Sequence, residues 1–216
     1  MDAPSFFLAL ISTQSPLLPL PWVERFYLHL AWGLVLAWGA SWLLKERRLV
    51  FSAKLKPWLP LLLILWCLWP GPASPAYWLG LAFRAPSLLL MLLCAWALLA
   101  HYRPARWAPA PMQAMRHRAW VLVVLGWALL LDTLAFWPVS LYSLGFAPLT
   151  LGVLALLGLL PWLLRDAGRL SVLLVVVLAL HVLLRLPSGN VWDALLDPWL
   201  WIALQAEGLR RKLRRS

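Results

Sequence analysis

The sequence predicts an all-α protein, a polytopic membrane helix bundle of about seven transmembrane helices. Of its 216 residues, 63% are hydrophobic and 12% are charged, whereas a soluble domain is about 45–50% apolar and about 25% charged. The mean hydropathy is +0.81, and several stretches of about 20 residues carry no charge, as membrane spans require. This composition excludes a soluble enzyme, a DNA-binding domain and a secreted disulfide scaffold. The two cysteines, Cys67 and Cys94, lie within apolar runs and have no CxxC spacing.

Residues 1–24 are expected to form a lead-in on the outer face of the membrane. A signal peptide begins with basic residues, but the only early charge here is Asp2, and prolines at 16, 19 and 21 interrupt the apolar run. Seven candidate spans follow: Phe26–Leu44, Trp58–Trp69, Pro86–Tyr102, Ala119–Trp137, Pro148–Leu164, Leu170–Leu184 and Trp192–Ala206.

Two of these spans, the second and the seventh, are shorter than the roughly 20 residues that cross a bilayer core. They depend on bilayer thinning or on neighbouring helices. The apolar segment Tyr77–Phe83 follows a stretch rich in glycine and proline, Gly71–Pro75. We therefore expect this segment to be a re-entrant or interfacial piece.

Lys and Arg divide unequally between alternate loops, and this division sets the orientation in the membrane. Sixteen of the 19 basic residues fall on one side, while Arg25, Arg84 and Arg185 fall on the other. The split predicts an outer amino terminus and a cytoplasmic carboxyl terminus. The net charge of +11 is thus a topology feature that favours anionic lipid headgroups, and no nucleic-acid partner is expected. The cytoplasmic set is Lys45, Arg47, Arg48, Lys54, Lys56, Arg103, Arg106, Arg116, Arg118, Arg165, Arg169, Arg210, Arg211, Lys212, Arg214 and Arg215.

Many of the 17 tryptophans lie near predicted span ends, where indoles favour the membrane interface. Four others, Trp32, Trp38, Trp96 and Trp127, fall inside spans. The interfacial set is Trp22, Trp42, Trp58, Trp69, Trp78, Trp107, Trp120, Trp137, Trp162 and Trp192.

Ionisable residues within the spans are the candidate site residues. Asp132 lies far from the cytoplasmic end of the fourth span, His29 near the outer end of the first and His181 in the outer half of the sixth. By depth they could form one polar cluster, as in a proton relay, or the two histidines could ligate a haem. The simpler interpretation is that Asp132 hydrogen-bonds neighbouring helices, His29 is interfacial and a carbonyl caps His181.

A stripe of small residues runs along the first span. Gly33, Ala37 and Ser41 recur every fourth residue, and such spacing permits close helix approach. The stripe packs either against the protein's own bundle, which is the preferred interpretation, or against a partner.

Motifs that build active sites do not occur in the sequence. It contains no HExxH, GxSxG, Walker or CxxC motif, and its eight acidic residues are scattered. We expect neither enzymatic activity nor a cofactor or metal site.

From about Lys54 onward, the order of features resembles the bacterial rod shape-determining protein MreD family. The strongest likeness is the segment from Asp132 to Leu144, which is similar to the family's Asp-x-Leu-x-x-x-Pro-Leu-Gly-Leu-x-x-Leu pattern at Asp132, Leu134, Pro138, Leu141 and Leu144. Ser140 stands where the family usually has glycine, and the first span is an addition. The other similar segments are Lys56–Pro70, Arg84–Pro86, His101–Arg103, Asp197–Trp201 and Leu209–Arg215.

The resemblance implies three regions: the lead-in 1–24, an extra transmembrane helix with a basic loop at 25–53, and a six-helix membrane domain with a basic cytoplasmic tail at 54–216. It also implies a non-enzymatic inner-membrane scaffold for wall synthesis and cell shape. Its partners would be MreC, the MreB cytoskeleton, and RodA with its transpeptidase. The alternative is a small transporter subunit, such as the substrate-capture component of an energy-coupling-factor importer, whose pocket the four interior indoles could line.

Overall fold

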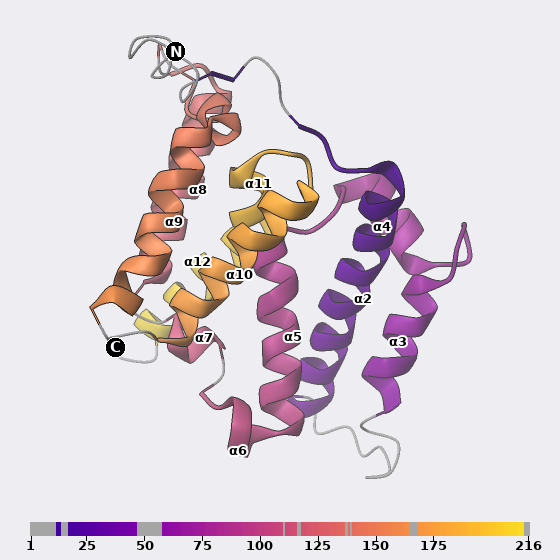
Figure 1. Cartoon of the computed structure of the whole chain (residues 1–216). Coiled ribbons are helices and arrows are strands. Elements are labelled where there is room, and N and C mark those ends of the chain that lie inside the picture. The colour runs from indigo at the N-terminus through magenta and orange to yellow at the C-terminus, as the bar shows by residue number, and fades with distance from the viewer. Residues whose placement is uncertain are drawn as a thin grey trace. The chain divides into compact units, whose positions relative to one another are not determined.

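A computed structural model describes residues 12–13, 17–46, 58–109, 111–115, 118–136, 138, 140–164 and 168–213 (Figure 1). All regular elements within these residues are helices, and no strand occurs among them. The predicted all-helical fold is therefore confirmed for the described chain. The elements are α2 (Pro21–Glu46), α3 (Trp58–Leu68), α4 (Pro75–Phe83), α5 (Leu88–Tyr102), α6 (Pro104–Trp107), α7 (Pro111–Ala114), α8 (Ala119–Thr133), the 3-10 helix η1 (Ser143–Phe146), α9 (Pro148–Leu163), α10 (Arg169–Leu184), α11 (Val191–Leu195) and α12 (Pro198–Leu213).

The chain divides into two compact units. One, the α2–α7 unit, comprises Leu20–Ala114, and the other, the α8–α12 unit, comprises Met1–Pro19 together with Met115–Ser216. This division by compactness does not coincide with the boundary near residue 54 that the family resemblance implies, which stays a prediction.

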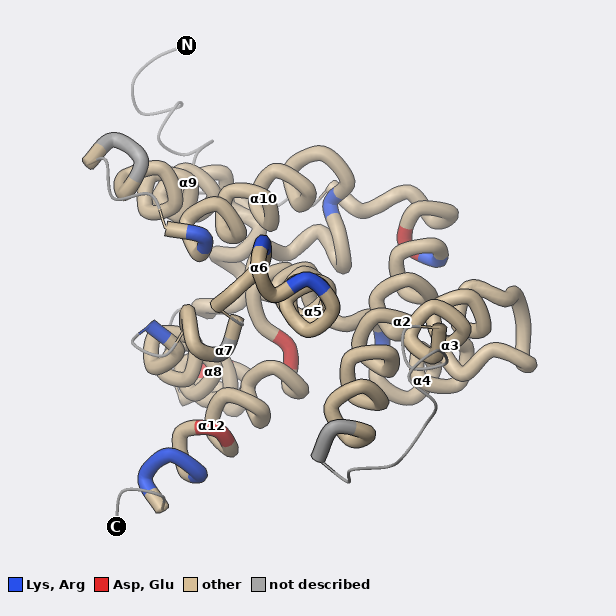
Figure 2. Tube along the Cα trace, turned by 90° about the horizontal axis from the view of Figure 1, so that it is seen from below, with Lys and Arg blue, Asp and Glu red and all other residues tan. Residues whose placement is uncertain are grey.

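In the α2–α7 unit, α2 lies between α3 and α5 (Figures 1 and 2). His29 near the start of α2 contacts the carbonyl of Cys67 near the end of α3, so these two helices run in opposite directions. Trp32 of α2, Cys67 of α3 and Ala76 of α4 are buried together in one apolar cluster.

Serine side chains begin the next two helices of this unit. Ser74 Oγ accepts the N–H of Ala76 at 3.2 Å, and Ser87 Oγ accepts the N–H of Leu90 at 3.1 Å. Each satisfies an amide that the first helical turn leaves without a partner. The chain turns between α4 and α5 at Arg84, whose φ is +60°.

In the α8–α12 unit, α10 packs on α9, and α12 packs on α8. The Trp201 indole N–H of α12 donates to the Val123 carbonyl of α8 at 3.1 Å, and Gly126 leaves the space that this indole fills.

The amino-terminal residue Leu17 also belongs to this unit. A Cβ on Gly189, whose φ is +83°, would lie 2.5 Å from the Leu17 carbonyl oxygen, so Gly189 meets both a conformational and a steric requirement.

Four predicted spans coincide closely with single helices: Trp58–Trp69 with α3, Pro86–Tyr102 with α5, Pro148–Leu164 with α9 and Leu170–Leu184 with α10. The first predicted span, Phe26–Leu44, lies within α2, which is longer because it begins at Pro21 and ends at Glu46. The segment Tyr77–Phe83 is helical within α4.

Two predicted spans were wrong in their bounds. The fourth ends at Thr133 instead of Trp137, because Asp132 binds the chain that follows and turns it back. The seventh, Trp192–Ala206, is broken between α11 and α12. Asp197 accepts the N–H of Leu200 at 2.8 Å, and Pro198 lacks an N–H, so both residues favour a new helix start here.

One described helix, over Pro21–Leu44, is long and apolar enough to cross a membrane by itself, and five shorter apolar helices accompany it. Several predicted features lie outside the described residues. They are residues 1–11 and 14–16 of the lead-in, most of the loop Lys45–Lys56, Arg116, His117, Trp137, Arg165 and the tail 214–216.

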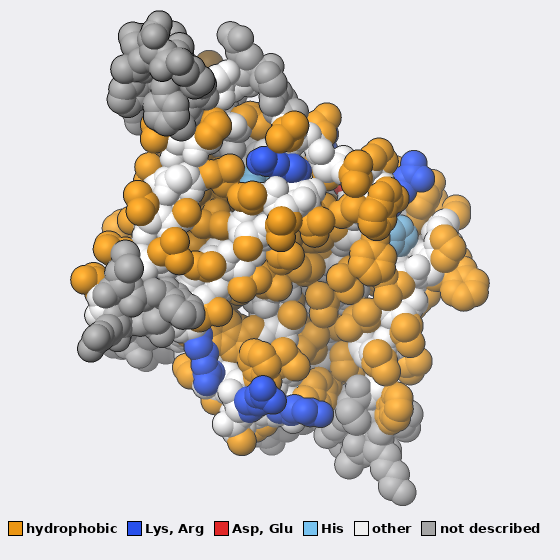
Figure 3. Space-filling view, viewed as in Figure 1, with side chains coloured by type: hydrophobic (Ala, Val, Ile, Leu, Met, Phe, Trp, Pro, Cys, Tyr) orange, Lys and Arg blue, Asp and Glu red, His pale blue; other side chains and the backbone are white. Residues whose placement is uncertain are grey.

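Large apolar side chains are exposed on every one of these apolar helices. On α9 alone they include Leu149, Val153, Leu156, Leu157, Leu159 and Leu160. Figure 3 shows hydrophobic side chains over α2, α3 and α5 as well. Extended apolar surfaces of this kind mark sites that contact a membrane or another protein.

Candidate functional site

Asp132 lies in the last turn of α8, and its carboxylate binds the loop that follows. Oδ1 accepts the N–H of Leu141 at 2.9 Å, and Oδ2 accepts the N–H of Tyr142 at 2.7 Å. The Ser140 hydroxyl also donates to Oδ2, at 3.2 Å. Three donors therefore converge on this side chain, and its acceptor atoms are used in holding the loop rather than in bonds between helices.

This loop contains most of the segment from Asp132 to Leu144. Ala135, with a φ of +56°, starts the return of the chain, and Leu141 and Leu144 are partly buried where the loop closes. Leu134 and Phe136 are 61% and 71% exposed, and Pro138 is exposed as well. The loop thus presents apolar side chains outward from a fixed polar base.

A second acidic residue, Asp193 in α11, completes this base. Its carboxylate accepts the Tyr142 hydroxyl at 2.8 Å and also the Ser188 hydroxyl. Asn190 donates through Nδ2 to the Tyr142 carbonyl at 3.0 Å, and the Trp192 indole donates to the Leu141 carbonyl at 3.0 Å. We call Asp132, Ser140, Tyr142, Ser188, Asn190, Trp192 and Asp193 the loop cluster.

The sequence prediction missed the contribution of α11 to this cluster. Asn190 is the only asparagine in the chain, and its Oδ1 caps α11 by accepting the N–H of Trp192 at 2.9 Å. Asn three residues before an acidic residue is a helix-start pattern, so the capping role could have been found. Its second bond, to the Tyr142 carbonyl, depends on tertiary structure. Gly145 leaves room for Asn190, since a Cβ there would overlap Asn190 Oδ1.

His181 is fully buried near the end of α10. Its Nδ1 lies 2.8 Å from the Leu186 carbonyl oxygen. Because a carbonyl only accepts, Nδ1 carries the proton, and the simpler interpretation of a carbonyl-capped histidine is confirmed. Nε2 has no partner among the described residues. His181 and Asp132 therefore bind different groups, and the described chain contains no set of three His, Cys, Asp or Glu residues that could hold a metal.

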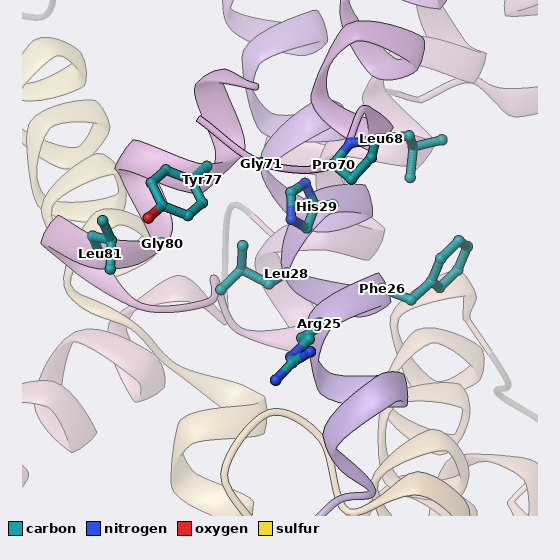
Figure 4. Close-up of a pocket in the computed structure, with 10 residues that line it drawn as sticks. All are labelled: Arg25, Phe26, Leu28, His29, Leu68, Pro70, Gly71, Tyr77, Gly80 and Leu81. Carbon is teal, nitrogen blue, oxygen red and sulfur yellow. The ribbon is translucent and has the colours of Figure 1, made fainter. Parts of the chain in front are cut away.

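His29 belongs to the α2–α7 unit, where it helps to close the α3–α4 turn. Its Nδ1 lies 2.6 Å from the Cys67 carbonyl oxygen, which also accepts the Ser74 hydroxyl at 2.7 Å. Beside His29 is a pocket of about 560 Å³ lined by α2, α3, α4 and the turn between α3 and α4 (Figure 4). Its polar side chains are Arg25, His29 and Tyr77, and most of the rest of its lining is apolar.

Neutral donors hold the loops around this pocket. The Trp32 indole donates to the Arg84 carbonyl at 2.8 Å, and the Tyr27 hydroxyl donates to the Pro86 carbonyl at 2.5 Å. Trp66 and Trp78 donate to the carbonyls of Ala73 and Pro72 at 2.9 Å and 2.8 Å.

The four interior indoles do not line this pocket. Trp32 and Trp96 are buried and donate to backbone carbonyls. Trp127 is half exposed and makes an edge contact with Trp201. The prediction that the four interior indoles line a substrate pocket is therefore not met at the pocket beside His29.

The small-residue stripe on α2 packs inside its own unit. A Cβ on Gly33 would lie 3.2 Å from the Cα of Ile64 in α3. Ala37 and Ser41 are buried, and Ser41 Oγ donates to the Ala37 carbonyl at 2.8 Å. The contact at Gly33 agrees with the preferred interpretation that the stripe packs against the protein's own bundle, and partner binding by the stripe stays untested.

Comparison with known proteins adds no relative: no family model, curated protein or solved structure matches this chain.

Proposed function

We propose that this chain is a multi-pass protein of the bacterial inner membrane with its amino terminus outside. The six apolar helices, together with α12, would make seven crossings. The observation that carries this proposal is the exposure of large apolar side chains on every apolar helix, which lipid would cover. Helices shorter than about 20 residues, such as α9 with 16, would be accommodated by bilayer thinning and neighbouring helices.

The distribution of charge along the helices supports the proposed orientation. Arg103 at the end of α5 and Arg106 in α6 are exposed, and Arg210, Arg211 and Lys212 lie in the last turn of α12 (Figure 2). These ends would be cytoplasmic under the positive-inside rule. The loop cluster and the pocket beside His29 would lie at the outer face.

Cysteine labelling tests the proposed crossings. Ala82 in α4 and Ala105 in α6 are both exposed, whereas the native Cys67 and Cys94 are buried. We expect an impermeant maleimide added to intact cells to label Ala82→Cys and Ser5→Cys. Ala105→Cys and Ser216→Cys should react only after the membrane is opened. Labelling of Ser216→Cys in intact cells would contradict the orientation.

Within this class, we propose a non-enzymatic scaffold of wall elongation, similar to MreD, with MreC, MreB, and RodA with its transpeptidase as partners. The support is the loop from Asp132 to Leu144. The likeness to the family is strongest in this segment, and its polar groups bind one another while Leu134 and Phe136 face outward. Exposed apolar residues on a fixed loop are suited to contact a partner.

A pull-down from mild detergent tests the scaffold. We expect MreC to co-purify with the wild-type chain, and less of it with Leu134→Ser and Phe136→Ser. Leu183→Ser is the matched control, because Leu183 is equally exposed on α10 but lies outside the loop. Depletion should round or widen the cells.

The alternative function is the substrate-capture component of an importer, and the pocket beside His29 is the observation that favours it. Normal cell shape on depletion, together with recovery of an ATPase-driven importer, would reject the scaffold in favour of this alternative.

A further inference from the structure

The pocket beside His29 combines an apolar wall with a single cationic side chain. Phe26, Leu28, Leu68 and Leu81 form much of the wall. Gly80 has no side chain, and Leu28 fills the space where its Cβ would be, so α4 approaches α2 closely at this point. Figure 4 shows Arg25, Leu28 and His29 projecting from α2 along one side of the pocket.

Arg25 and His29 are four residues apart on α2 and so lie on the same helix face. Glu24 is the nearest acidic residue in sequence, but adjacent residues on a helix point about 100° apart. Among the described residues, no ion pair is formed by Arg25. The guanidinium is therefore available for an anion.

His29 offers a different chemistry from Arg25. Its Nδ1 is occupied by the Cys67 carbonyl oxygen at 2.6 Å, and this bond fixes the proton on Nδ1. In the neutral imidazole, Nε2 is then an acceptor. A ligand that fits both residues carries an anionic oxygen for Arg25 and a hydroxyl group for Nε2.

The apolar wall indicates that the rest of the ligand is hydrophobic. Phe26 and Leu81, which line the pocket, are 57% and 68% exposed, so the wall continues onto the outer surface of α2 and α4. A free inorganic anion would gain nothing from this surface, whereas an acyl chain would lie along it.

We propose that the pocket binds an anionic phospholipid whose headgroup carries hydroxyl groups. Arg25 binds the phosphate, His29 Nε2 accepts a headgroup hydroxyl, and an acyl chain lies along Phe26 and Leu81. This inference rests on the proposed membrane location, but it depends only on the α2–α7 unit and not on the number of crossings or on any protein partner.

Thermal unfolding of the purified full-length chain in dodecylmaltoside tests the site. The probes are dioleoylphosphatidylglycerol, dioleoylphosphatidic acid, dioleoylglycerol and inorganic phosphate, each titrated separately. We expect phosphatidylglycerol to raise Tm most. Phosphatidic acid has the phosphate without the glycerol hydroxyls and should raise Tm less, while the other two probes should leave it unchanged.

Arg25→Gln and Arg84→Gln form a matched pair, because both arginines are exposed and belong to the same unit, but only Arg25 lines the pocket. We expect Arg25→Gln to weaken phosphatidylglycerol binding by about tenfold, the loss of one charge-assisted bond, while Arg84→Gln keeps wild-type binding. Native mass spectrometry of the retained lipid provides a second readout.

Three results would overturn the proposal: equal binding by Arg25→Gln and wild type, an equal effect of inorganic phosphate, or no preference for phosphatidylglycerol over phosphatidic acid. Binding in micelles does not depend on membrane orientation. Failure of the lipid site and failure of the proposed topology, which cysteine labelling reports, are therefore separate results.

Discussion

The two units hold their interhelical loops by different chemistry. In the α2–α7 unit, neutral donors on the helices reach backbone carbonyls, as Trp32 does at Arg84 and Tyr27 does at Pro86. In the α8–α12 unit, the neutral donors Asn190 and Trp192 also reach loop carbonyls. There, however, carboxylates collect donors from the loops as well, as Asp132 does from Leu141 and Tyr142.

This difference shows two solutions to one problem. Each loop has backbone N–H and C=O groups that helices no longer satisfy and that need other partners. An indole offers one donor and a large apolar surface, so it satisfies one carbonyl without introducing a charge. A carboxylate accepts several bonds at once, and it therefore fixes a longer loop but makes that loop dependent on one side chain.

The largest effect is expected at Gly145, where the loop cluster leaves no room for a side chain. Gly145→Ala places a Cβ against Asn190 Oδ1 and displaces the amide from Tyr142. We expect a loss of about 3 kcal/mol in unfolding free energy, from overpacking and a broken buried hydrogen bond. Chemical unfolding in detergent measures it. Gly152→Ala is the control, because nothing lies within 4 Å of that position; an equal loss there would contradict the assignment.

The second-largest loss of stability is expected on α2, where the variant tests helix packing rather than hydrogen bonds to a loop. Gly33→Leu forces α2 away from Ile64 of α3, and we expect a loss of about 2 kcal/mol. Gly39→Leu, in the same helix with open space around it, should be close to neutral. Circular dichroism during thermal unfolding of both variants checks this, and equal Tm values would show that the stripe does not form the contact.

Asp132 tests the comparison between the two units directly. Asp132→Leu removes all three bonds that the carboxylate accepts. We expect its Tm to fall less than that of Gly33→Leu and more than that of Trp32→Phe. Asp132→Asn should be intermediate, because its amide keeps one acceptor oxygen but turns N–H groups toward donors. Differential scanning calorimetry measures the order. A relay carboxylate would instead leave Tm unchanged in Asp132→Asn while activity disappears.

The smallest effect is expected at a single indole. Trp32→Phe keeps an aromatic ring but removes the donor to the Arg84 carbonyl, and we expect a loss of about 1 kcal/mol. Trp120→Phe is the control, because this indole is 65% exposed. If Trp32→Phe cost more than Asp132→Leu, a single indole would hold its loop more firmly than the carboxylate does, and the distinction between the units would be wrong.

Hydrophobic runs and helix-start residues were sufficient to predict much of the helical structure. Ser87 before α5 and Pro148 at the start of α9 mark helix starts by local chemistry alone. Asp197 and Pro198 are also helix-start residues, but the apolar residues on both sides led to the prediction of one continuous span. Hydropathy is averaged over a window of residues, so it does not detect a helix break of only two residues.

The candidate sites were less predictable for a physical reason. The importance of Asp132 followed from its rarity in an apolar run, but its partners Leu141 and Tyr142 act through backbone N–H groups, which every residue except proline has. The joining of Asn190 to Tyr142 depends on how α10 returns the chain. Spacing along one helix does not contain that information.

The contact of Leu17 with Gly189 has a consequence for synthesis. The α2–α7 unit is continuous in sequence, so all its parts exist once residue 114 has been made. The α8–α12 unit is discontinuous, and its first part, at Leu17, leaves the ribosome long before Gly189 does. Residues 17–19 therefore cannot contact Gly189 until the whole α2–α7 unit has been synthesised. A tag fused in front of Leu17 would then disturb the α8–α12 unit, which is completed last, rather than α2, which follows the tag in sequence.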